Sequence, residues 1–161
     1  MKFYLPEEYQ DLCYTQFQTY KRRISLLLPD AVVEHVGSSA IPGAISKGDL
    51  DIYVGVEPRE LEGAVQQLYK LEFSVKQNTL RTHELCMLES KTEDVAFQVV
   101  ANGSQFECFL KFREQLRSSP DLVNRYNKLK QSCEGYSPED YRRIKSEFIE
   151  QVLSNQFENI M

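Results

Sequence analysis

Apolar residues recur along this chain at two spacings, one typical of helices and the other of strands. Between residues 8 and 28, apolar side chains return every three to five positions, and Pro29-Asp30 follows them. This pattern predicts a helix with one buried face that ends at the proline. Helical spacing returns over residues 58–71, 105–118 and 121–132. Ser137-Pro138, followed by acidic residues, is a helix start signal and predicts a last helix to about residue 157.

Four segments in the middle of the chain have the composition of strands, namely residues 31–36, 49–56, 80–88 and 95–100. In the second segment the even positions from 50 to 56 are apolar, whereas Asp49, Asp51 and Tyr53 occupy odd positions. Successive side chains of a strand point to opposite faces, so both aspartates share one face. The polar residues 89–94 would join the last two strands as a hairpin.

The order of these elements predicts the fold class. Strands occupy the middle of the chain, and helices flank and follow them, which is typical of an α+β (mixed α/β) fold. At 161 residues the chain fits one domain. We expect an α/β core over about residues 1–104 and a helical C-terminal extension over about residues 105–161 that packs on it.

Composition and charge narrow the functional classes. The chain is 42% hydrophobic and 27% charged, as in ordinary globular proteins. Its net charge of −5 argues against an extended, sequence-independent nucleic-acid interface, which needs a basic face. A small nucleotide needs only a few cations. The N-terminus lacks the apolar run of a signal peptide, and no stretch reaches the roughly 18 apolar residues of a membrane span. We therefore expect no membrane association and a cytoplasmic location.

The cysteines are spaced too widely to indicate a metal site. Cys13, Cys86, Cys108 and Cys133 contain no Cys-x-x-Cys pair, which argues against zinc. A chain able to bury a core of its own does not need a disulfide framework, so we expect four reduced thiols.

The segment from residue 35 to 54 combines a Gly-Ser turn with the aspartate pair. A strand leads into Gly37-Ser38-Ser39, a short linker follows, and Asp49 and Asp51 open the next strand. Glycine lets the backbone approach a phosphate closely, and hydroxyls and free amides at a turn donate to phosphate oxygens. Two carboxylates at i and i+2 lie near enough to share hard divalent cations, which in turn clamp a triphosphate. This order predicts a metal–nucleotide site.

Simpler explanations exist for the same residues. A solvated strand face often carries two acids, although side-by-side acids repel and usually have a reason to be kept. Lys47 precedes the aspartates and is either a phosphate contact or a solvated loop lysine. His35, beside the turn, either orients a group of the site or is a hydrogen-bonded strand histidine.

The order Gly-Ser, linker, Asp-hydrophobic-Asp-hydrophobic resembles the signature of the DNA polymerase β-type nucleotidyltransferase superfamily. More closely, residues 34–43 (Glu-His-Val-Gly-Ser-Ser-Ala-Ile-Pro-Gly) resemble the GrpB family. So do Phe112-Arg113, residues 117–120 (Arg-Ser-Ser-Pro), Tyr126-x-x-Leu129-Lys130 and Tyr141-x-x-x-Lys145. These patterns lie in order and cover nearly all of the chain from about residue 31.

The resemblance implies a nucleotidyltransferase fold with an antiparallel or mixed sheet and a helical C-terminus. It implies that Gly37, Ser38 and Ser39 bind phosphate and that Asp49 and Asp51 are catalytic and hold Mg²⁺ (or Mn²⁺). The metal-activated acceptor would then attack the α-phosphate of a nucleoside triphosphate and displace pyrophosphate.

One departure from the superfamily pattern concerns the third carboxylate. The matching strand is residues 95–100, and its inward candidate is Gln98, a neutral amide. Asp94, Glu93 or Glu84 would have to substitute, and the sequence places none of them. This departure bears on catalysis more than on nucleotide binding.

Three cations and a second histidine are further candidates. Arg113, Lys130 and Lys145 match family patterns and would form a cationic wall opposite the aspartates; otherwise they are solvated or paired with nearby acids. Arg113 is the preferred phosphate ligand of the three, because it follows an apolar helix face. His83 joins the site only if its strand borders the groove.

Three functional hypotheses follow. The first is a magnesium-dependent transferase that moves a nucleotidyl group from a nucleoside triphosphate to an unknown small-molecule or protein acceptor. The second, suggested by Gln98, is a non-catalytic nucleotide-binding or regulatory module that retains the fold. The third is an interaction protein with solvated aspartates. The sequence specifies neither the donor base nor the acceptor.

Overall fold

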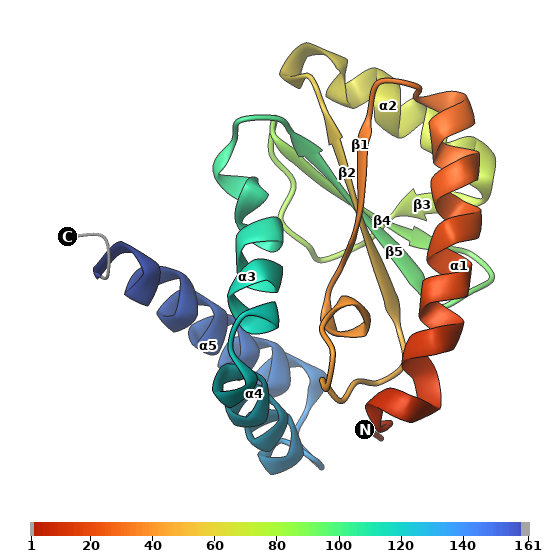
Figure 1. Cartoon of the computed structure of the whole chain (residues 1–161). Coiled ribbons are helices and arrows are strands. Elements are labelled where there is room, and N and C mark those ends of the chain that lie inside the picture. Colours follow the sequence, from red (N-terminus) through yellow and green to blue (C-terminus); the bar gives the residue numbers. More distant parts are fainter. Residues whose placement is uncertain (1, 159–161) are drawn as a thin grey trace.

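The computed structural model describes residues 2–158, with helices packed on both faces of one five-stranded mixed sheet (Figure 1). The strands are β1 (Val32–Val36), β2 (Leu50–Val56), β3 (Phe73–Val75), β4 (Leu85–Ser90) and β5 (Val95–Ala101), in the spatial order β1-β2-β5-β4-β3. Strand β2 runs antiparallel to β1 and parallel to β5, and the other pairs are antiparallel. The predicted α+β class is confirmed.

One face of the sheet is covered by the helices α1 (Pro6–Leu27) and α2 (Leu61–Leu68) (Figure 1). The apolar even positions of β2 point to this side and join the largest buried cluster, together with Phe17, Tyr20 and Ile24 of α1. The predicted alternation of β2 is therefore confirmed. Burial of this apolar row fixes the other row, which contains Asp51, on the opposite face.

The opposite face carries the helices α3 (Cys108–Arg117), α4 (Pro120–Ser132) and α5 (Pro138–Glu158) (Figure 1). These helices share a second core, in which Phe112, Tyr126 and Phe148 pack as a trio of rings. Ser119 caps α4 by accepting a hydrogen bond from the Leu122 amide. No helix within residues 2–158 is long and apolar enough to cross a membrane.

The prediction was least accurate between residues 72 and 90. Strand β3 was missed, and the strand predicted at residues 80–88 begins only at Leu85. Exposed residues such as His83 precede it, because pairing with β5 starts where Leu85 faces Val100. The predicted helix over residues 58–71 is α2 flanked by two 3-10 turns, Pro58–Glu60 and Tyr69–Leu71.

Candidate functional site

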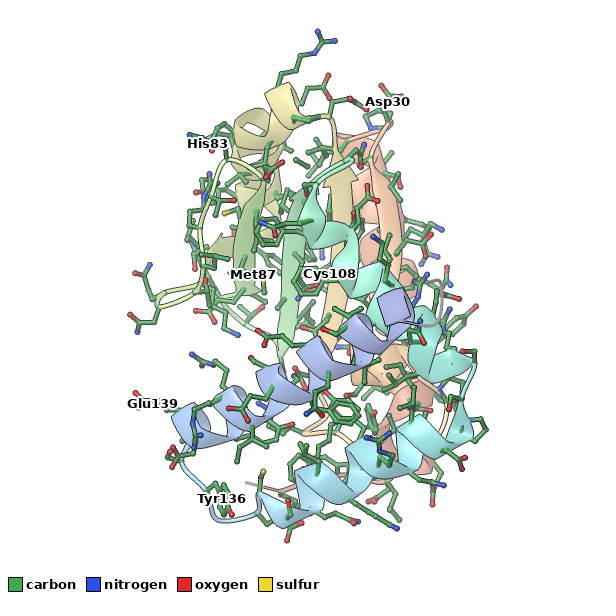
Figure 2. All side chains as sticks on the ribbon, turned by 90° about the vertical axis from the view of Figure 1, so that its left-hand side faces the viewer. Asp30, His83, Met87, Cys108, Tyr136 and Glu139 are labelled. Atoms are coloured by element: carbon green, nitrogen blue, oxygen red, sulfur yellow. The ribbon has the colours of Figure 1, made fainter. Side chains whose placement is uncertain are left out.

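A cavity of about 610 Å³ opens between the sheet and helices α3 and α5. Its floor is formed by Asp51 of β2, Gln98 of β5 and Met87 of β4, which lie on neighbouring strands. Figure 2 shows Met87 and Cys108 facing this region and α5 crossing it. Gly37, Ser38 and Asp49 also line the cavity, so the fold brings most of the predicted constellation together.

The two aspartates are held by neutral partners. Ser46 Oγ donates to Asp49 Oδ1 at 3.3 Å and accepts from the Gly48 amide at 3.1 Å. Gln98 Nε2 donates to Asp51 Oδ1 at 3.2 Å. Burial, followed by repulsion from Asp49, raises the pKa of Asp51 to about 6. The pair is therefore under electrostatic stress that a bound cation would relieve.

Gly37 brings the turn against Asp51. Its φ of 75° and ψ of −175° lie in a region that is essentially restricted to glycine. A β-carbon at this position would stand 2.5 Å from Asp51 Oδ2 and 3.0 Å from Asp51 Cβ. The absence of a side chain thus keeps open the space between the turn and the carboxylate.

Helix α4 fixes the loop that carries Ser38. The buried Lys130 ammonium donates to Ser38 Oγ and to the Ile45 carbonyl, and lies 4.1 Å from the centre of the Tyr126 ring. Asn127 accepts from the Ile45 amide at 2.9 Å and donates to the Gly43 carbonyl at 2.8 Å. These contacts hold the segment between the Gly-Ser turn and β2 at its start and in its middle.

Cationic side chains outnumber carboxylates along the cavity wall. Four cations from separate parts of the chain line it: Lys47, Lys76, Arg142 and Lys145. The phenol groups of Tyr126 and Tyr141, followed by the two aspartates, raise the pKa of Lys145 above its ordinary value. Lys47 and Lys145 both lie near the Tyr141 ring, at 5.7 and 6.0 Å from its centre. The cavity is suited to an anionic ligand in a chain whose net charge is −5.

The oxygen donors of the site fit a magnesium ion. Asp49 and Asp51 offer carboxylates, and Gln98 Oε1 is buried without a hydrogen-bond partner among the described residues. Magnesium prefers such hard oxygen ligands, takes one or two carboxylates and keeps water or phosphate oxygens in its remaining positions. Among the described side chains, no cluster of three or more His, Cys, Asp or Glu residues could hold a metal. Water or oxygens of a bound phosphate would have to complete the coordination of an ion held here.

The GrpB protein family model matches residues 7–155, which is nearly the whole chain. The chain belongs to the GrpB family. A UPF0157 protein of Vibrio cholerae is 60% identical over 154 residues, covering 95% of this chain and 82% of the relative. The crystal structure of the conserved protein GrpB from Enterococcus faecalis aligns with a TM-score of 0.78 at 18% identity, over 97% of this chain and 99% of that chain.

The fold is shared with nucleotidyltransferases. The Cid1 poly(U) polymerase, solved with MgGTP bound, aligns with a TM-score of 0.52 at 17% identity. The match covers 72% of this GrpB chain and 38% of the polymerase. At this identity the likeness establishes a shared fold, and the nucleotidyltransferase-type architecture implied by the sequence is confirmed.

The structure corrects the predicted position of Arg113. The Arg113 guanidinium lies on the other side of the Gly-Ser turn, in a smaller cavity of about 360 Å³ against α1. It donates at 2.9 Å to Glu34, to Glu114 and to the His35 carbonyl. This GrpB chain thus uses Arg113 to attach α3 to β1, because Glu34 offers a carboxylate beside it. Of the predicted cationic wall, Lys145 lines the main cavity, and Lys130 reaches it through Ser38.

Ser39 and His35 also face the smaller cavity. His35 Nε2 lies 2.7 Å from Ser39 Oγ, and the His35 ring stacks on Phe17. Ser39 is buried and does not line the cavity that contains the aspartates. His83 is exposed on the segment before β4, far from α5 in Figure 2.

Protonation of His35 should make the GrpB chain less stable in acid. Burial, followed by Arg117 and Arg113, lowers the pKa of His35 from 6.5 to about 4. Between these values the unfolded chain binds a proton that the folded chain refuses, so stability falls as pH falls. The variant lacks this titrating group. We therefore expect the unfolding free energy of wild type, relative to that of His35→Gln, to fall by about 3 kcal/mol from pH 7.5 to pH 4.

Urea unfolding of both proteins across this pH range measures the effect. The raised pKa of Asp51 acts in the opposite direction, because the folded state binds the extra proton there. Taking the difference between the two proteins removes this contribution. A difference that stays constant with pH would show that His35 titrates normally in the folded chain.

Four residues of the site could not be predicted from the sequence. Ser46 and Asn127 position the site through hydrogen bonds, and Lys76 and Arg142 line the cavity. Only Ser46 carried a local signal, because it precedes Asp49 in the linker. The other three come from the residue after β3 and from the C-terminal helices, which no short motif connects to the aspartates.

Proposed function

We propose that this GrpB chain is a magnesium-dependent nucleotidyltransferase that transfers a nucleotidyl group from a nucleoside triphosphate to an acceptor. The observation that carries the proposal is the contact between the Gly37 turn and Asp51 in a cation-lined cavity. The turn offers backbone amides and the Ser38 hydroxyl, while Asp49 and Asp51 offer hard oxygens beside it. Phosphate and metal ligands thus meet at one point.

A buried positive charge supports phosphate binding at the turn. Lys130 is 1% exposed, and among the described residues no carboxylate forms a salt bridge with it. Burial, followed by repulsion from Lys145, lowers the pKa of Lys130. An unpaired buried ammonium costs free energy. Phosphate oxygens near Ser38 would give this charge the counter-ion it lacks.

The residues of the site divide into three roles. Gly37 and Ser38 hold the phosphates next to β1, and Lys47 of the linker and Lys145 of α5 add positive charge. Asp49 and Asp51 would hold Mg²⁺, which when bound neutralises phosphate charge. The Cid1 polymerase, which shares the fold, is solved with MgGTP bound and gives an independent reason to test this ligand.

A second candidate function is nucleotide binding without turnover. Gln98 favours it, because a neutral amide occupies the position at which the superfamily pattern has a third carboxylate. The amide also donates to Asp51, as a supporting residue would. The two functions share the nucleotide site and differ in whether pyrophosphate is released.

Thermal unfolding with each of the four nucleoside triphosphates, with and without Mg²⁺, tests the shared site. We expect one nucleotide to stabilise the protein only with Mg²⁺, by roughly 2.7 kcal/mol at a hundred times its dissociation constant. Pyrophosphate release in candidate acceptor mixtures then separates turnover from binding. If no nucleotide changes the unfolding temperature, neither function holds.

Replacing Lys130 with methionine should separate nucleotide binding from folding. Methionine has a similar length and suits the apolar surroundings, but it leaves Ser38 and the Ile45 carbonyl without this donor, so we expect the unfolding free energy to fall by about 2 kcal/mol. Nucleotide affinity should fall roughly tenfold or more, because a charge-assisted contact is lost. Lys128→Met, at an exposed position on the same helix, is the matched control for calorimetric titration. Equal affinities in both variants would remove Lys130 from the phosphate site.

A further inference from the structure

The cavity continues beyond the aspartates on the side away from the Gly37 turn. Next to β2, Gln98 of β5 donates to Asp51, and Met87 of β4 is the register partner of Gln98. The Lys76 amide then donates to the Met87 carbonyl at 2.9 Å, which places Lys76 at the far edge of this row. Strands lie about 4.8 Å apart, so Lys76 begins roughly 14 Å from β2, with a side chain that reaches back into the cavity.

A second cation enters from α5. Arg142 lies one turn inside this helix, whose start, marked by Glu139, is on the same side of the view as Met87 (Figure 2). Among the described residues, neither Lys76 nor Arg142 forms a salt bridge. Arg143, the next residue, instead pairs with Asp140 and Glu147 outside the cavity. Two positive charges therefore remain available on this side.

The geometry of nucleotidyl transfer indicates what the Lys76 side of the cavity would bind. Attack on the α-phosphorus proceeds in line with the leaving group. With the β- and γ-phosphates at the Gly37–Ser38 turn, the acceptor has to approach from the Gln98–Met87–Lys76 side. The cations on that side would therefore meet the acceptor.

The side chains near this approach are poor proton acceptors. Gln98 is a neutral amide, and its Nε2 is already bonded to Asp51. Burial raises the pKa of Tyr126, and also that of Tyr141, which reaches about 12, so both phenols stay protonated. The aspartates are engaged with the metal in the proposed function. An acceptor that is already an anion needs no base.

We propose that the acceptor is a phosphate monoester, bound through Lys76 and Arg142 on the side of the aspartates opposite the Gly-Ser turn. This inference rests on the proposed function. An oxygen of the acceptor phosphate attacks the α-phosphorus and forms a new P–O bond. The bond between the α-phosphorus and the bridging oxygen breaks, and pyrophosphate leaves with the electron pair. The product is a phosphoanhydride, and no proton or redox equivalent is transferred.

Methyl phosphate is the minimal probe for this subsite. The full chain is first saturated with Mg²⁺ and the α,β-methylene analogue of the nucleotide that stabilises it most. Calorimetric titration of this complex with methyl phosphate should give saturable binding, and acetate at equal ionic strength should give none. Lys76→Gln and Arg142→Gln should each lower the affinity for methyl phosphate roughly tenfold or more. Their effect on the affinity for the nucleotide analogue should be smaller by that factor.

Arg143→Gln is the matched control, because it removes the same charge one residue away, on the outer face of α5. Three results would overturn the inference: no methyl phosphate binding to the loaded protein, equal binding of acetate, or affinities unchanged in both cavity variants. Failure of the analogue itself to bind with Mg²⁺ would instead contradict the proposed function. The two failures are thus read from separate titrations.

Discussion

Replacing Asp51 with asparagine is expected to abolish stabilisation by magnesium and nucleotide while making the free protein more stable. The carboxylate is half-buried beside Asp49, and burial and this repulsion raise its pKa to about 6. A neutral amide of the same shape removes the cost of keeping that charge. We expect the unfolding free energy of the free protein to rise by about 2 kcal/mol at pH 7.5.

The same substitution removes half of the charge that would hold a divalent ion. The stabilisation of roughly 2.7 kcal/mol expected for wild type at a hundred times the dissociation constant should therefore disappear. Urea unfolding with and without Mg²⁺ and nucleotide measures both effects. Asp30→Asn, at an exposed turn far from the cavity in Figure 2, is the control that should change neither. Full nucleotide stabilisation in the Asp51 variant would contradict the proposed site.

Replacing Gly37 with alanine should be among the most destabilising changes in the chain. The backbone conformation is restricted to glycine, and the new methyl group would stand 2.5 Å from Asp51 Oδ2. Asp51 would have to move, which breaks its bond with Gln98. Backbone strain and overpacking together should cost about 3 kcal/mol.

Gly103→Ala separates strain from the clash. Gly103 has a similar φ of 84°, but a β-carbon there would meet nothing within 4 Å. We expect it to cost about 1 kcal/mol from backbone strain alone. Chemical denaturation of both variants gives the comparison. Similar costs for the two substitutions would mean that the contact between the turn and Asp51 is looser than the structure indicates.

The sequence by itself determined the elements whose apolar side chains recur at a fixed period. Strand β2 could be predicted because side chains alternate with a period of two, and burial of Leu50, Ile52 and Val54 leaves one orientation for Asp51. The Gly-Ser turn could be placed next to the aspartates because β1 and β2 pair directly and only a short linker joins them. These relations are local, so the backbone geometry fixes them.

The tertiary structure alone decided which distant side chains reach the cavity. The sequence singled out Arg113 and gave no signal for Lys76, yet the first turns away to Glu34 and the second lines the cavity. The difference depends on how α3 packs on β1 and on where β3 joins the sheet edge. Both depend on contacts between residues far apart in the chain, which are set by packing of the whole core. Such contacts produce no periodic pattern in the sequence, so they could not be predicted from it.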